Sequence, residues 1–138
     1  MKTYQIEFGW EIDIPEDWIH EIGERGVYMY YPPNDSTTMY ASVFTAAGNG
    51  DGQAAPAEVL EDFYVKSLNT CNAEEIPLKV GEGLGCRAFF CVDDKKIYRI
   101  AAGVFTVGNL LSLNVYSESK DMVYKVAEWF SAVRFNGG

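Results

Sequence analysis

The chain has 138 residues, of which 48% are hydrophobic and 14% aromatic, and it carries a formal net charge of -9. A chain of this length and composition can bury enough apolar surface to fold without disulfides or structural metals, so we expect residues 1–138 to form a single domain. Eleven basic residues against twenty acidic ones repel phosphate backbones and anionic lipids, which argues against binding to nucleic acids or membrane surfaces.

The N-terminal segment from Tyr4 to Ile14 alternates apolar and polar side chains, which predicts one half-buried strand. Pro15 ends it, because proline cannot donate a hydrogen bond to a sheet. The segment has neither the apolar run nor the cleavage site of a signal peptide, and no stretch of the chain is apolar enough to span a bilayer. We therefore expect a cytoplasmic protein, and an envelope location only if a signal has been removed.

Trp18 follows this proline by three residues and is either a core residue or part of a binding site. As a core residue it would bury on the order of 200 Å² of surface. As a ligand platform it would need several polar groups around it, and the sequence places only Glu16, Asp17 and His20 nearby. The pattern favours the core.

The next two apolar runs predict an antiparallel hairpin, with strands from Val27 to Tyr31 and from Thr38 to Thr45 around the turn sequence PPND. Tyr28 and Tyr30 lie on the same side of the first strand, and Tyr40 lies on the second. Because tyrosine is enriched at interfaces, these three residues are candidates for a protein-docking surface. The alternative is burial under a helix, which the apolar character of both sides of the first strand favours.

The second candidate for a protein-docking surface is acidic and lies on a predicted helix. The glycine-rich stretch from Ala46 to Pro56 matches no phosphate-binding motif and is interpreted as a connector. Pro56 then suits the first turn of a helix that runs to about Leu68. The carboxylates on this helix are candidates for contact with a partner protein: Glu58, Glu61 and Asp62.

The C-terminal half predicts further strands and a final helix. The strand candidates are 76–80, 86–92, 97–107 and 111–115, and the helix begins at the N-cap Ser119 with apolar residues at a period near 3.6. The strand 97–107 is apolar on both sides, which is typical of a sheet covered on both faces. The predicted fold class is therefore α+β, with a mostly antiparallel sheet of about six strands sandwiched by two main helices.

The reactive side chains form no recognised catalytic or metal-binding motif. The cysteines, Cys71, Cys86 and Cys91, have no CxxC spacing, and His20 is the only histidine, so we expect neither a metal site nor a cofactor. Two alternatives to a binding role stay open. One is a small hydrolase or transferase in which folding brings His20 to Cys86. The other is a carrier that holds a small ligand between the sheet and a helix.

The segments IPEDW (Ile14 to Trp18) and FSAVRF (Phe130 to Phe135), together with the order of the elements, resemble the PsbP-like superfamily. This superfamily includes the DcrB-like lipoproteins and the Mog-type Ran-binding proteins. The resemblance implies an antiparallel sheet between helices, with Pro15, Trp18, Phe130 and Phe135 in structural positions. No lipobox cysteine stands near the start of this chain, unlike in the lipoprotein branch.

The resemblance implies no shared catalytic chemistry, because members of the superfamily, some of them bacterial, mostly bind other proteins. We therefore expect a non-enzymatic accessory or protein-binding domain whose partner is a protein that the sequence does not identify. The sequence predicts no oligomeric state.

Overall fold

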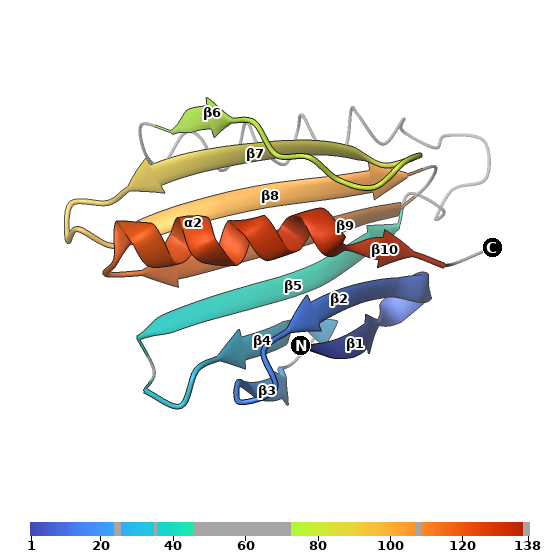
Figure 1. Ribbon diagram of the computed structural model, residues 1–138. Coiled ribbons are helices and arrows are strands. Elements are labelled where there is room, and N and C mark those ends of the chain that lie inside the picture. The colour runs from blue at the N-terminus through green and yellow to red at the C-terminus, as the bar shows by residue number, and fades with distance from the viewer. Residues whose placement is uncertain (24–25, 35, 46–72, 107–108, 137–138) are drawn as a thin grey trace.

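The computed structural model describes residues 1–23, 26–34, 36–45, 73–106 and 109–136 (Figure 1). In chain order the described elements are β1 (Lys2–Ile6), η1 (Glu7–Gly9), β2 (Trp10–Ile14), β3 (Ile19–Ile22), β4 (Tyr28–Tyr31), β5 (Thr37–Thr45), β6 (Glu74–Ile76), β7 (Gly85–Val92), β8 (Tyr98–Thr106), β9 (Asn109–Ser117), α2 (Lys120–Trp129), η4 (Phe130–Ala132) and β10 (Arg134–Phe135).

The larger of two sheets, here called the large sheet, has seven strands in the order β3-β4-β5-β9-β8-β7-β6. All of its neighbouring strands pair antiparallel. The predicted hairpin around PPND is confirmed as the β4–β5 pair, in which Tyr30 lies opposite Met39. The strands predicted at 86–92, 97–107 and 111–115 are confirmed as β7, β8 and β9, which pair antiparallel in chain order and form a meander.

The smaller sheet, here called the small sheet, has three strands in the order β1-β2-β10. The single strand predicted from Tyr4 to Ile14 is instead a hairpin, in which Ile6 pairs with Trp10. The 3-10 turn between its strands contains Gly9 at a φ of 94°, a conformation that residues with a Cβ rarely adopt. The alternation of side chains persists through this turn, so the sequence pattern alone reads as one strand.

Helix α2 and the small sheet lie on the same face of the large sheet, side by side (Figure 1). The helix is amphipathic and buries Val123, Val126 and Ala127. Together the three units enclose one main core, whose fully buried large side chains include Trp10, Tyr30, Phe130, Ile100 and Leu113.

The opposite face of the large sheet, here called the outer face, carries a second, smaller core cluster of Phe89, Ala101 and Leu110. Residues on both sides of β8 are therefore buried, from Ile100 to Val104. This burial agrees with the apolar pattern on both sides of the strand predicted at 97–107.

The predicted fold class is wrong in its layers. The described chain is mostly antiparallel β-structure, with ten strands in two sheets and one α-helix, and not a sheet of about six strands sandwiched by two main helices. The small sheet, which was not predicted, lies beside α2 on the same face of the large sheet. The other predicted helix, from Pro56 to about Leu68, lies outside the described residues.

Candidate functional site

Pro15 and Trp18 form a tight turn after β2, in which the Trp18 N–H donates to the Pro15 carbonyl at 3.1 Å. The turn directs the indole into the core, where Trp18 is 7% exposed and packs edge-to-face on Trp129 of α2 with ring centroids 5.2 Å apart. Phe130 is buried in the same core, and Phe135 packs on Trp10 with ring centroids 4.8 Å apart. These contacts join α2 to the turn after β2, and β10 to β2, which are structural roles.

The three tyrosines proposed as a docking surface do not share one surface. Tyr28 and Tyr30 pair with Ala41 and Met39, so they point to the side of the large sheet that α2 and the small sheet cover. Tyr40 pairs with Met29 and points to the outer face, where it packs edge-to-face on Tyr116 at 5.9 Å between centroids. The prediction that Tyr40 shares a surface with Tyr28 and Tyr30 is therefore wrong. The register of the hairpin, which decides this, cannot be read from the sequence.

Tyr30 is 1% exposed and therefore cannot contact a partner in the folded state. Burial, with smaller effects from Tyr28 and Tyr4, raises the pKa of its hydroxyl well above the usual value, so the group stays neutral. Glu58, Glu61 and Asp62, the other predicted docking residues, lie outside the described residues.

The alternative dyad of His20 and Cys86 is also wrong. His20 lies in β3 and Cys86 in β7, with β4, β5, β9 and β8 between them. At the usual strand spacing these two strands lie about 24 Å apart, far beyond hydrogen-bond reach. Burial moreover raises the pKa of the Cys86 thiol to about 12, so the nucleophilic thiolate is scarce at neutral pH.

Two exposed isoleucines lie on β3, at one edge of the large sheet, and one of them, Ile22, is the most exposed large apolar residue on a described strand. All four residues of β3 are exposed, with Ile19 at 42% and Ile22 at 67%. Ile22 pairs with Tyr28 and Ile19 with Tyr31, so each side of the strand carries one isoleucine. Strand β3 is not among the predicted strands, although two β-branched residues between Trp18 and Gly23 are a signal for it.

Exposed acidic residues lie close to these isoleucines in the chain. Glu16 and Asp17, in the turn that precedes β3, are exposed, and so is Glu21 within the strand. His20, also exposed, lies with its ring 4.8 Å from the ring of Tyr4. No described strand pairs with the other edge of β3, so this edge combines a backbone without a partner in the described part of the chain, two apolar side chains and local negative charge.

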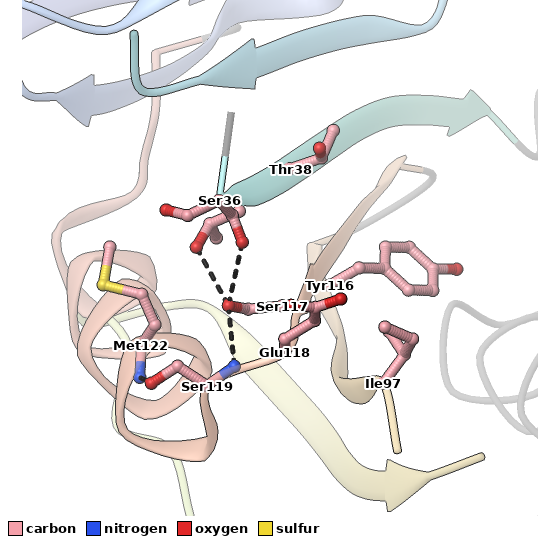
Figure 2. Close-up of a pocket in the computed structure, with 9 residues that line it drawn as sticks. Ser36, Thr38, Ile97, Tyr116, Ser117, Glu118, Ser119 and Met122 are labelled. Carbon is pink, nitrogen blue, oxygen red and sulfur yellow. Dashed lines mark hydrogen bonds between the residues drawn. The ribbon is translucent and has the colours of Figure 1, made fainter. Parts of the chain in front are cut away.

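A pocket of about 540 Å³ opens at the end of β5, β8 and β9, beside the N-terminus of α2 (Figure 2). Ser117 lies at its centre. The Ser117 hydroxyl donates to the Ser36 carbonyl and accepts from the Thr37 hydroxyl and the Ser119 N–H, each at 3.1 Å. These hydrogen bonds connect β5, β9 and the start of α2. Since the Ser117 hydroxyl donates its hydrogen to a carbonyl and not to a base, it is not arranged as a nucleophile.

Among the residues that the structure describes, no three His, Cys, Asp or Glu side chains gather closely enough to hold a metal ion. No helix in the same part of the chain is long and apolar enough to cross a bilayer.

The comparisons with known proteins bear on the fold. No protein-family model matches the sequence, and no curated protein is significantly similar to it. Among solved structures, a crystal structure from Bacteroides thetaiotaomicron VPI-5482 superposes with a TM-score of 0.67 at 12% identity; the match covers 98% of this chain and 48% of that one. This chain therefore spans about half the length of that protein.

The solution structure of cyanobacterial PsbP (CyanoP) from Synechocystis sp. PCC 6803 superposes with a TM-score of 0.66 at 14% identity, over 97% of this chain and 91% of that one. At such identities the likeness concerns the fold alone. Since the match extends over nearly the whole of both chains, this protein has the PsbP-like fold that the resemblance of its sequence implied.

Proposed function

We propose that the protein is a non-enzymatic binding domain that docks an extended segment of a partner protein on the edge strand β3. The partner segment would add a strand to the large sheet and would carry basic and apolar side chains. This proposal keeps the accessory role expected from the sequence and moves the docking surface from the tyrosine hairpin to the edge beside it.

The exposure of β3 is the observation that carries the proposal. An edge strand presents unpaired backbone N–H and C=O groups, and extended peptides bind such edges by continuing the sheet. Proteins that avoid such pairing protect their edges with lysine, proline or inward-pointing charges. Strand β3, with the sequence IHEI, has no lysine and no proline, and it exposes an isoleucine on each side.

Charge indicates the kind of partner. Glu16, Asp17 and Glu21 lie around the two isoleucines, and the whole chain has a net charge of -9. An approaching basic segment is attracted by this field, and an acidic one is repelled. We therefore expect a partner segment that alternates apolar residues with lysine or arginine.

The proposal is tested by selecting peptides from a random display library against the full chain. We expect the selected peptides to alternate basic and apolar residues and to protect the β3 amides from hydrogen exchange. Ile22→Asp should weaken their binding at least about tenfold, because it removes an apolar contact and adds a charge at the edge.

Val92→Asp is the matched control, because Val92 is also an exposed aliphatic residue, at 44%, but lies at the end of β7. Binding should be unchanged in this variant. Selected peptides that protect another region, or that bind Ile22→Asp as well as they bind the natural chain, would contradict a docking site on β3.

A further inference from the structure

The described arginines differ in whether they form an ion pair with a carboxylate. Arg87 pairs with Glu75 at 3.1 Å, and Arg134 pairs with Asp13 at 3.1 Å. Arg99 forms no ion pair with any described residue, although acidic residues outnumber basic ones by twenty to eleven in the chain. Arg99 is half-buried, and removing a charge from water is costly unless the charge is paired.

Arg99 is nevertheless held in place. Its Nε and Nη2 groups donate to the side-chain oxygen of Asn114 at 3.2 and 2.8 Å, and the Asn114 amide in turn donates to the Ser112 hydroxyl at 3.3 Å. The guanidinium lies over the ring of Tyr116, 5.3 Å from its centroid, and Tyr116 packs edge-to-face on Tyr40. These contacts orient the guanidinium without neutralising it, because Asn114 is uncharged.

The hydrogen bonds to Asn114 use one edge of the guanidinium, formed by Nε and Nη2. The edge formed by Nη1 and Nη2 has no partner among the described residues. Two parallel N–H groups on one edge of an arginine match the two oxygens of a carboxylate. Arg99 is thus preorganised to receive a carboxylate end-on.

Space for the rest of such a ligand lies beyond Tyr116, in a pocket that Arg99 itself does not line. Arg99 and Tyr116 are opposite each other on β8 and β9, and Tyr116 is opposite Thr38 on β5. Tyr116, Thr38 and Ile97 line the pocket of about 540 Å³ shown in Figure 2. The ring of Tyr116 therefore borders both the guanidinium and the pocket.

We propose that Arg99 anchors a binding site for a small monocarboxylate with an aromatic or aliphatic body. The carboxylate would bind the Nη1 and Nη2 groups, and the body would pack on Tyr116 toward the pocket. A doubly charged phosphate is disfavoured, because Glu118 lines the same pocket and the chain is strongly acidic. Since β4, β5 and β9 separate Arg99, on β8, from β3, the inference does not depend on the proposed function.

The test is an NMR titration of the ¹⁵N-labelled full chain with benzoate, at constant ionic strength so that screening does not change. Small ligands of this size bind weakly, so the titration should extend to about 20 mM. We expect the Arg99 Nε–H signal and the amides of β8 and β9 near Tyr116 to shift with benzoate. Neutral benzamide, which has the same ring, should cause no comparable shift, and inorganic phosphate a smaller one.

Arg99→Lys keeps the positive charge but loses the planar pair of donors, so benzoate should bind at least about tenfold more weakly. Arg87→Lys is the matched control on the same face, because Arg87 already pairs with Glu75, and it should bind benzoate like the natural chain. Thermal unfolding of both variants verifies that they fold.

Three results would overturn the inference. They are the absence of shifts at Arg99 throughout the titration, equal shifts with benzoate and benzamide, and equal binding by Arg99→Lys and the natural chain.

Discussion

Trp18 connects the turn after β2 to the last turn of α2, because its ring packs on Trp129 at the boundary of the main core. Tyr30 is similarly enclosed, and its ring lies 5.1 Å from that of Tyr4 in β1. Large aromatic side chains gain more free energy from burial than any others, so the ones that stand out in the sequence are frequently core residues. At the residue scale, the exposed isoleucines of β3, and an Arg99 that has no carboxylate partner among the described residues, are therefore better guides to binding than the tyrosines of the hairpin.

Trp18→Ala should lower the free energy of unfolding by about 3–5 kcal/mol, because it removes a large buried side chain and leaves a cavity. Urea denaturation followed by circular dichroism measures the change. Glu16→Ala, in the same turn but exposed, should change stability by no more than about 0.5 kcal/mol. Equal effects of the two substitutions would mean that the indole does not stabilise the core.

At the element scale, local signals explain where most strands and the helix begin and end. Helix α2 begins after Ser119, whose hydroxyl accepts a hydrogen bond from the Met122 N–H at 3.3 Å. Asp121 in the first turn adds a favourable interaction with the helix dipole. The first hairpin is different, because its turn at Gly9 falls within an uninterrupted alternation of apolar and polar residues.

Ser119→Ala should cost about 1 kcal/mol of stability, since it leaves an N–H of the first turn of α2 without its cap. Ser119→Asp should retain most of the stability, because aspartate caps a helix equally well and its charge suits the N-terminus. Thermal and urea unfolding of the pair provide the measurement. If aspartate is as destabilising as alanine, the hydroxyl does not act as a cap.

At the scale of the whole molecule, the small sheet joins the two ends of the chain. Arg134 of β10 donates to both oxygens of Asp13 in β2, each at 3.1 Å, and Thr3 of β1 donates to the same carboxylate at 2.7 Å. The hydrogen bonds from Arg134 and Thr3 hold the pKa of Asp13 below its usual range. One carboxylate therefore links all three strands of this sheet.

A lowered pKa in the folded state means that the ionised Asp13 stabilises the fold above its unfolded pKa of about 3.9. This stabilisation is lost as the pH falls through the lower pKa of the folded state. Asp13→Asn should thus cost up to about 1 kcal/mol at pH 7, a modest value because the pair is partly exposed, and the difference from the natural chain should shrink below about pH 4.

Urea unfolding of both proteins at several pH values measures this dependence. Glu82→Gln, at an exposed turn, serves as the control at pH 7 and should leave stability unchanged. A difference for Asp13→Asn that stays constant as the solution is acidified would show that the ion pair with Arg134 does not contribute.

The sequence by itself determined the β4–β5 hairpin, the meander of β7, β8 and β9, and the capped helix α2. These features depend on periodicity and on turn or cap residues that are close together in the chain. The likeness to the PsbP-like fold could be predicted for the same reason, since it rests on the order of these elements and on packing residues at the segments IPEDW and FSAVRF.

Only the tertiary structure decided how the strands are distributed and which side chains are left for binding. The hairpin at Gly9, the union of β10 with β2 and the edge position of β3 depend on pairing between distant segments. Likewise, Arg99 differs from Arg87 and Arg134 only in which residues the fold places beside it. Strand order and ion pairing are properties of contacts across the sheet, and the local pattern of residues does not specify them.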